Sequence, residues 1–265
     1  MPLQISGAIL TRDNERTIAR AVRSLLPFIS ELIIVDDGST DNTLSIIREL
    51  YPEVKVLTRK LDQFHAQRNF ALERVAAEWV VMIDSDEEIT TPLADAIQRE
   101  LARPRRDLYR CYRLNEALGR STKVVLDRPI LFRKHLRFSG ALHETIELHN
   151  PGFLPAELLH HSWVDVADWI DDINQYSTYQ AKKWLIEERN YNTFQLALIA
   201  LGMPLYHFCK LFFGQRRYRN GFFAGLVYPL AQAAEWWFVI LKYYEYRYLQ
   251  HAEKPADIRR EKPKF

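Results

Sequence analysis

Glycine and cysteine are both scarce in this chain of 265 residues. Neither G-x-G-x-x-G nor G-x-x-x-x-G-K-[ST] occurs among its few glycines, which argues against a glycine-rich phosphate loop. The two cysteines, Cys111 and Cys209, are too few for a disulfide framework or a cysteine-rich zinc site, so we expect a reducing compartment. The first residues, Met1–Gln4, have neither the basic nor the apolar region of a signal peptide. Hydrophobic residues make up 48% of the chain and charged residues 26%, which excludes a disordered or fibrous protein.

Charge is divided unevenly along the chain, although the formal net charge is +2. Residues 182–265 carry 14 Lys+Arg and 7 Asp+Glu, a net charge of +7, whereas residues 1–181 carry 22 and 27, a net charge of −5. We expect the acidic part to hold a metal ion and the basic part to face anionic lipid or nucleic acid. Nucleic acid is disfavoured as a partner, because the basic cluster 216–219 is short and lies between very apolar segments.

The first hundred residues alternate apolar runs with amphipathic segments. The expected strands are 3–10, 31–35, 54–57 and 79–83, and the expected helices are 14–26, 41–50, 65–76 and 92–101. Strands that are apolar almost throughout are typical of a parallel sheet covered by helices on both faces, so the pattern predicts an α/β fold. From residue 108 to about 148 the runs are shorter and predict antiparallel additions to the sheet, and after Trp163 the chain is expected to be helical.

The helical part contains two unusually apolar segments, 194–213 and 222–241. Each is about long enough to cross a hydrocarbon core of ~30 Å, but each contains ionisable residues and a proline. Arg216, Arg217 and Arg219 lie between them, a pattern typical of helices in a membrane interface. A helical subdomain packed on the rest of the protein, an oligomer contact and true membrane spanning are the alternatives. We expect a catalytic domain over 1–165, a helical membrane-interface region over 166–252 and a charged tail over 253–265.

Polar and acidic residues follow three of the predicted strands. Thr11-Arg12-Asp13-Asn14-Glu15 follows the strand 3–10. Asp84-Ser85-Asp86 follows the strand 79–83, and its alternate carboxylates can approach one divalent cation. Asp36-Asp37-Gly38 follows the strand 31–35, where Gly38 permits a tight turn and one carboxylate can accept a hydrogen bond from a nucleobase. Because ligands bind beyond the carboxyl ends of parallel strands, these acids predict a site at that edge of the sheet. The alternative is that both segments are helix-capping turns without a ligand.

As a set and in this order, the motifs resemble those of the inverting GT-A glycosyltransferases of family 2. The resemblance is strongest in Ile9–Glu15, Val35–Asp41, Ala66–Ala71 and Met82–Glu87. Two later segments, Phe138–Glu144 and Tyr218–Gly225, are similar to the branch that includes bacterial lipopolysaccharide-core β-glycosyltransferases. The resemblance implies the GT-A fold, a Rossmann-like, mostly parallel sheet with helices on both faces.

The family resemblance also implies roles for individual residues. Thr11 and Asp37 would hold the nucleobase of a UDP sugar, and Arg68 would lie near the base or the diphosphate. Asp84 would contact the ribose or the metal shell, and Asp86 would bind Mn²⁺ or Mg²⁺.

A second group of candidate residues contains the expected base and three histidines. Glu144 is the predicted general base, and His143 is predicted to ligate the metal or to orient Glu144, although a structural histidine is the alternative. The pair His160-His161 is more often structural than ligating.

Together these features predict a metal-dependent inverting glycosyltransferase. Its expected acceptor is a membrane-anchored glycolipid such as the lipopolysaccharide inner core, and its expected location is the cytoplasmic face of the inner membrane, with no nucleic-acid partner. A nucleotidyltransferase would also use paired acids and a metal ion. A catalytically silent sugar-nucleotide-binding protein would keep Asp37 and Asp86 without needing a base.

Overall fold

The computed structural model describes residues 4–139, 146 and 150–249. The chain forms two compact units. Of the described residues, the first unit contains 4–116 and those within Val124–Ser162, and the second, called here the helical unit, contains Ala117–Lys123 and 163–249.

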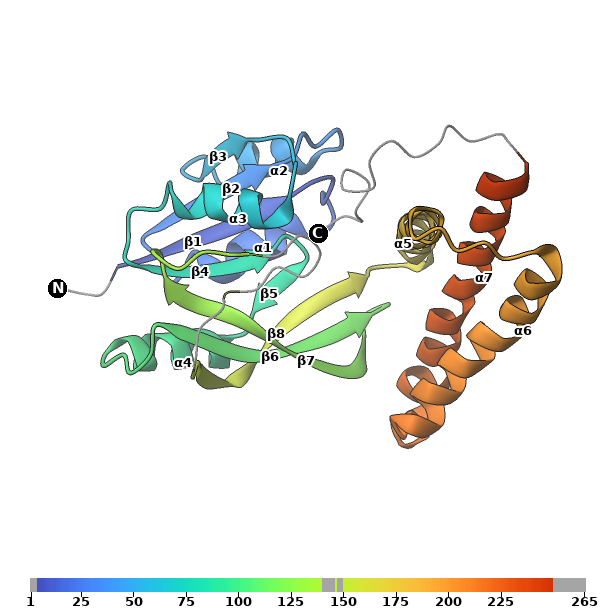
Figure 1. The fold of residues 1–265 in the computed structure, drawn as a ribbon. Helices are drawn as coiled ribbons and strands as arrows, with labels where there is room; N and C mark the ends of the chain where they lie inside the picture. Colours follow the sequence, from blue (N-terminus) through green and yellow to red (C-terminus); the bar gives the residue numbers. More distant parts are fainter. Residues whose placement is uncertain (1–3, 140–145, 147–149, 250–265) are drawn as a thin grey trace. The chain divides into compact units, whose positions relative to one another are not determined.

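The first unit is built on a mixed sheet of eight strands in the order β3-β2-β1-β4-β7-β6-β8-β5 (Figure 1). Four neighbouring strands run parallel, as the sequence predicts: β3 (Lys55–Thr58), β2 (Glu31–Asp36), β1 (Ile5–Thr11) and β4 (Trp79–Asp84). The helices that follow these strands are α1 (Ile18–Leu25), α2 (Thr43–Leu50), α3 (Phe64–Leu72) and, after a short fifth strand, α4 (Thr91–Leu101). The predicted α/β alternation is therefore confirmed, with helix starts that differ by one to four residues.

Alternate residues of the parallel strands pack into two different cores. Ile9 and Ile34 contribute to a core shared with α1, α2 and α4, whereas Leu10 and Ile33 contribute to a core shared with α3. Side chains of a strand point alternately to opposite faces, so a strand buried on both faces must be apolar at every position. This requirement explains the continuous apolar runs in the sequence and leaves the strand ends as the place for polar residues.

Antiparallel strands complete the sheet: β5 (Glu87–Ile89), β6 (Leu108–Ala117), β7 (Arg120–Arg133) and β8 (Gly152–Trp163). β7 runs antiparallel to β4, and β5 runs antiparallel to β8, with Glu87 paired with His160. The antiparallel additions are confirmed, but no sequence pattern predicts β5. Its three residues directly follow Asp86, and pairing with β8 is what makes them a strand.

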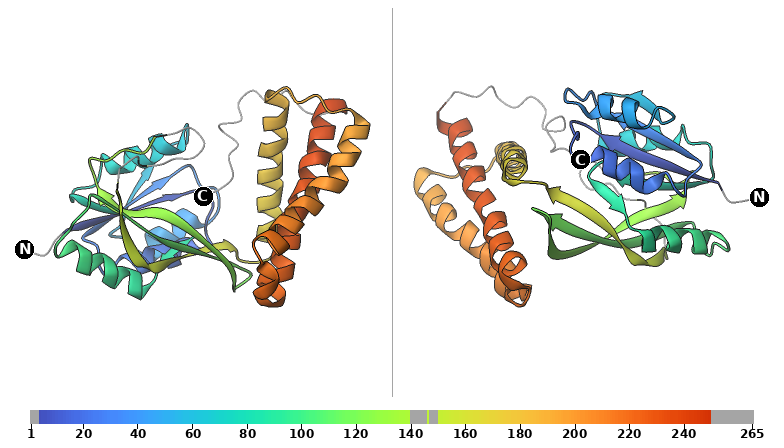
Figure 2. Two further views of the ribbon diagram at one scale, coloured as in Figure 1. Left: turned by 60° about the horizontal axis from the view of Figure 1, so that its bottom comes forward. Right: turned by 180° about the vertical axis from the view of Figure 1, so that it is seen from behind.

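The helical unit contains three long helices, α5 (Val166–Ile186), α6 (Thr193–Cys209) and α7 (Tyr228–Tyr248). α6 and α7 run side by side as a hairpin (Figure 2). Asn192 and Gln195 form a capping box that starts α6. Short π- and 3₁₀-helical turns, Lys210–Gly214, Arg217–Arg219 and Phe223–Val227, connect the two helices. A core around Trp184, Leu196 and Tyr243 joins α5, α6 and α7.

Two stretches of this unit, Thr193–Gly214 and Phe223–Tyr248, are long and apolar enough to cross a membrane by length and composition. In the first, 11% of the most apolar window is buried, and in the second 39%. A core helix of a soluble protein would be mostly buried, so these helices present apolar side chains that the described structure leaves exposed, such as Leu201 and Leu241.

Candidate active site

The carboxyl ends of three parallel strands bring the predicted donor-binding residues to one edge of the sheet. Thr11 pairs in register with Asp36, and Leu10 pairs with Asp84. The backbone N–H of Asp37 donates to the carbonyl oxygen of Thr11 across 3.0 Å. The edge therefore gathers Thr11, Asp37 and Asp84, as the spacing of the motifs predicts.

The two adjacent aspartates at the end of β2 have different roles. Asp36 is fully buried and accepts hydrogen bonds from the backbone N–H groups of Gly38 (2.9 Å) and Ser39 (3.1 Å), which closes the turn. Gly38 has φ +79°, a left-handed conformation that glycine adopts without strain. Asp37 accepts from the backbone N–H of Leu61 (2.5 Å) and from Arg12 Nη1 (3.2 Å). A carboxylate has about four acceptor sites, so Asp37 retains capacity for a ligand donor.

Asp84 lies between two arginines at the end of β4. Its Oδ1 accepts from Arg68 Nη2 at 2.9 Å, and its Oδ2 accepts from Arg128 Nη1 at 3.1 Å. Burial works to raise the pKa of Asp84, but the charges of Arg68 and Arg128 outweigh it and hold that pKa well below the ordinary 3.8. Asp84 is therefore a fixed negative charge that positions two guanidinium groups.

Glu87 extends this network behind Asp84. It is almost fully buried, forms ion pairs with Arg128 and Arg113, and accepts the backbone N–H of Asp84 at 2.8 Å. Burial, together with the charge of Asp84, raises the pKa of Glu87 although Arg128 opposes the shift. Sequence reasoning missed Arg113, Arg128 and the structural role of Glu87. The signal for Arg113 was its period-two spacing from Tyr109 and Cys111, which are buried on the inner face of β6.

Several polar atoms at this edge have no hydrogen-bond partner within the described part of the chain. They are buried and belong to residues of the strand ends and the arginine network: Thr11 Oγ1, Arg68 Nη1, Ser85 Oγ, Asp86 Oδ1 and Arg113 Nε. Leaving a buried polar atom unpaired costs about 1–3 kcal/mol. Five such atoms at one sheet edge are typical of a site whose ligand supplies the missing partners.

Asp86 is paired with His160, which β8 brings beside it. The Nε2 atom of His160 lies 3.1 Å from Asp86 Oδ2, and its Nδ1 atom lies 3.2 Å from Asn115 Oδ1 and 3.0 Å from Ser162 Oγ. Burial works to lower the pKa of His160, but the charge of Asp86 and the hydrogen bond to it outweigh burial, so the pKa is raised above 6.5. A protonated imidazole donates from both ring nitrogens, which suits these oxygen partners.

His161 has surroundings of a different kind. Its Nε2 atom lies 3.1 Å from Glu88 Oε2 and its Nδ1 atom 3.3 Å from Glu116 Oε2, so both nitrogens are engaged by carboxylates. Its backbone N–H donates to the carbonyl oxygen of Asp86 across 2.9 Å. Of the two adjacent histidines, His160 therefore faces the candidate site, and His161 fixes the strand pairing behind it.

A divalent cation fits this arrangement in part. Asp86 offers the unpartnered Oδ1, and the neighbouring His160 offers an imidazole, both of which are ligands for Mn²⁺. Within residues 4–139, 146 and 150–249, no group of three or more His, Cys, Asp and Glu side chains is arranged to hold a metal. Such ions commonly bind through one or two carboxylates, with substrate phosphates at other positions.

The remaining predicted residues are His143 and Glu144, and both lie outside the described residues. Their roles as metal ligand and general base stay predictions. The flanking Phe138 is described: its carbonyl oxygen accepts from Asn69 Nδ2 at 2.9 Å, and its ring lies 5.4 Å from Arg68 Cζ. Phe138, six residues before Glu144 in sequence, is therefore held beside Arg68.

Comparisons with known proteins bear on the same part of the chain. The family model described as Glycosyl transferase family 2 matches residues 7–151. An uncharacterized glycosyltransferase of Rickettsia typhi is 26% identical over 247 residues, which cover 83% of this chain and 80% of that protein. One from Rickettsia conorii is 23% identical over 260 residues, with coverage of 86% and 87%.

Two solved structures are more distantly similar. TarS of S. aureus, residues 1–349 in complex with UDP-GlcNAc, aligns over 95% of this chain and 93% of that chain with 12% identity and a TM-score of 0.46. Glucosyl-3-phosphoglycerate synthase from Mycobacterium tuberculosis, in complex with Mn²⁺, UDP and phosphoglyceric acid, aligns over 50% and 56% with 19% identity and a TM-score of 0.37. The family match, which covers more than half of the chain, is the decisive finding. The chain belongs to glycosyltransferase family 2 and is a glycosyltransferase.

Proposed function

We propose that the enzyme transfers a sugar from a UDP sugar to a membrane-anchored glycolipid, with a divalent metal ion and with inversion at the anomeric carbon. The observation that carries this proposal is the sheet edge at which Asp37, Asp84 and Asp86 meet Arg68, with unpartnered polar atoms between them. Family membership makes sugar transfer the activity to which this edge contributes.

Donor binding follows from the chemistry of the individual side chains. Asp37 would accept the imide N–H of uracil, and the unpartnered Thr11 Oγ1 would hydrogen-bond the base. Arg68 has Nη2 fixed by Asp84 and Nη1 unpartnered, so it would donate to the diphosphate with little loss of side-chain freedom. Asp84 would contact the ribose while it keeps Arg68 in place.

The metal ion would be held by Asp86, with His160 as the described residue best placed to join it. Bound there, the metal would neutralise negative charge on the departing nucleoside diphosphate. His160 would have to lose a proton to ligate the ion, and Asn115 and Ser162 would then orient the ring through Nδ1.

The acceptor hydroxyl would lose its proton to Glu144, our proposed general base. With the leaving group stabilised on one side of the sugar and the base on the other, the reaction would be a single displacement. Inversion follows because the hydroxyl attacks from the face opposite the departing diphosphate.

The helical unit supports a membrane-bound acceptor. Exposed apolar side chains on α6 and α7 are accompanied by the basic residues of the turn between them. This combination is typical of peripheral membrane proteins and supports a location at a membrane surface, for which we propose the cytoplasmic face of the inner membrane. We propose a lipopolysaccharide inner core as the acceptor, because the segments Phe138–Glu144 and Tyr218–Gly225 are similar in sequence to the branch that includes lipopolysaccharide-core glycosyltransferases.

Calorimetric titration with a panel of nucleotide sugars, in Mn²⁺ or Mg²⁺, tests the donor and the metal together. We expect UDP sugars to bind, and Asp86→Asn to weaken binding by at least about tenfold, as for the loss of one interaction of ~1.4 kcal/mol. The matched control is Asp95→Asn, which alters an exposed aspartate on α4 and should bind as the wild type does. Equal affinity of wild type and Asp86→Asn, with and without a chelator, would remove the metal from the mechanism.

A further inference from the structure

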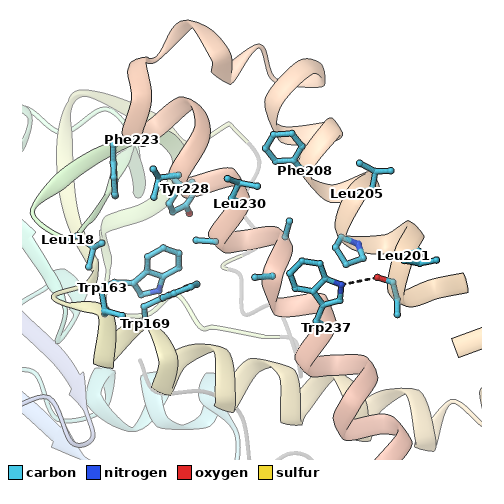
Figure 3. A pocket seen from close by; sticks show the side chains of 17 residues that line it. Leu118, Trp163, Trp169, Leu201, Leu205, Phe208, Phe223, Tyr228, Leu230 and Trp237 are labelled. Carbon is cyan, nitrogen blue, oxygen red and sulfur yellow. Dashed lines mark hydrogen bonds between the residues drawn. The ribbon is translucent and has the colours of Figure 1, made fainter. Parts of the chain in front are cut away.

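The helical unit contains an apolar cavity of about 690 Å³ (Figure 3). Its volume lies within the range of about 300–1,000 Å³ that is usual for ligand sites. The residues that line it all belong to the helical unit. Trp163 and Trp169 lie at one end, Leu205 and Phe208 contribute from α6, and Trp237 contributes from α7.

The walls of this cavity offer little to a polar ligand. The indole N–H of Trp237 donates to the carbonyl oxygen of Ala200 at 2.9 Å, and that of Trp163 donates to Asp172 Oδ2 at 3.1 Å. The protein itself therefore uses these two donors, whereas the buried Nε1 atom of Trp169, which also lines the cavity, has no hydrogen-bond partner in the described part of the chain. An apolar space of this kind gives water few hydrogen-bond partners and favours an apolar occupant.

The segment that forms much of the cavity is basic and lacks acidic residues. From Thr193 to Ala234 the sequence contains no Asp or Glu, whereas Lys210, Arg216, Arg217 and Arg219 lie in the turn between α6 and α7. We call Lys210–Arg219 the basic turn.

The basic turn adjoins the cavity. Arg217 Cζ lies 5.3 Å from the ring centroid of Tyr228, a cavity residue, and Arg217 Nη1 donates to the carbonyl oxygen of Thr122 at 3.0 Å. Phe208 and Phe223, which also line the cavity, lie just before and just after the turn in sequence. Arg216 and Arg219 are exposed and accessible to an anionic group.

We propose that this cavity binds a hydrocarbon chain of an anionic membrane lipid, whose phosphate contacts the basic turn. This deepens the proposed function, because it rests on the membrane location of the enzyme. A peptide in the same cavity would have to leave backbone polar groups without partners, and a second copy of this chain would bring a like-charged basic turn against the first. A lipid supplies an apolar chain and a negative charge in one molecule.

Quenching of tryptophan fluorescence by vesicles of phosphatidylglycerol with brominated chains tests this site. Trp163, Trp169 and Trp237 line the cavity, so a chain inside it should quench them. Ala234→Phe fills the cavity, and Ala231→Phe is a second filling variant at a neighbouring wall position. The matched control, Ala197→Phe, places the same ring on the exposed side of α6. Circular dichroism establishes that each variant is folded.

We expect both filling variants to bind the brominated lipid at least about tenfold more weakly than the wild type, and the control to bind within about twofold. Arg216→Gln combined with Arg219→Gln should reduce the preference for phosphatidylglycerol over phosphatidylcholine by about tenfold or more, because each basic residue near an anionic surface contributes to binding. Native mass spectrometry should detect one phosphatidylglycerol per chain.

Equal quenching of the filling variants and Ala197→Phe would overturn the proposal, and so would a lipid-free dimer in the mass spectrum. UDP titration of the same variants separates this outcome from the proposed function. If the donor site is right and the cavity proposal is wrong, UDP binding persists while lipid binding does not depend on the cavity.

Discussion

Replacing Arg128 by Met tests whether the buried charge network organises the donor-binding edge. Arg128 Nη1 lies 3.1 Å from Asp84 Oδ2, and the same guanidinium pairs with Glu87. The Arg128 side chain is 16% exposed, that of Asp84 14% and that of Glu87 0%, so the three charges are largely removed from water. Met keeps most of the volume of the side chain but leaves two buried carboxylates without the cation they share.

The expected cost is about 3–5 kcal/mol in the free energy of unfolding, because Arg68 and Arg113 then remain as the only described cations paired with Asp84 and Glu87, and part of the buried negative charge is left uncompensated. Arg110→Met is the matched control. Arg110 pairs with Asp127 at 2.7 Å, but the Asp127 side chain is 53% exposed, and surface pairs contribute about 0–1 kcal/mol. Urea unfolding followed by both tryptophan fluorescence and circular dichroism measures the two differences on the same scale.

The loss of unfolding free energy in Arg128→Met should also depend on pH. The lowered pKa of Asp84 contributes stability above the unfolded value of about 3.8, and this contribution is lost as pH falls through the folded pKa. In the variant, Asp84 keeps a higher pKa and gains its proton earlier during acidification. The difference in unfolding free energy between wild type and variant should therefore narrow as the pH falls below 3.8, toward the lowered pKa of Asp84 in the folded wild type. A cost equal to that of the Arg110 control, or a difference that widens in acid, would refute this account of the network.

Two further predictions concern single residues. Glu144→Gln should retain UDP-sugar binding in calorimetry, but its rate of sugar transfer should fall by about two or more orders of magnitude, as for a removed general base. Transfer at the wild-type rate would show that the base is another residue. Cys111 is fully buried, and burial raises the pKa of its thiol to about 12. A thiol reagent should therefore leave Cys111 unmodified in the native protein and modify it after unfolding in urea. Rapid modification of the native protein would contradict this prediction and show that the inner face of β6 opens.

The parallel half of the sheet can be predicted because residues close together in sequence identify each of its strands and turns. Apolar runs such as Trp79–Ile83 have to be buried on both faces, and Gly38 after the two aspartates signals a turn whose φ only glycine adopts easily. The strand ends therefore predict that Thr11, Asp37 and Asp84 lie at one edge, and the strand register brings them there.

The rest of the site depends on contacts between residues far apart in sequence. His160 reaches Asp86 because β5 and β8 pair, and Arg128 reaches Asp84 across 44 residues of chain. The three-residue β5 is too short to show a period. Arg113 and Arg128 are spaced by two from buried residues of their strands, but this spacing does not show which distant carboxylate an inward arginine contacts. His160 and His161 are adjacent in sequence, so the sequence alone does not distinguish their roles. Only the structure shows that His160 lies at the site, whereas His161 contacts Glu88 and Glu116.

A crystal structure with UDP and Mn²⁺, recorded where manganese scatters anomalously, tests the central claim most directly. The account predicts one manganese peak beside the carboxylate of Asp86, with the diphosphate within reach of Arg68 and the uracil against Asp37. A manganese peak away from Asp86, or UDP bound at another surface, would contradict it.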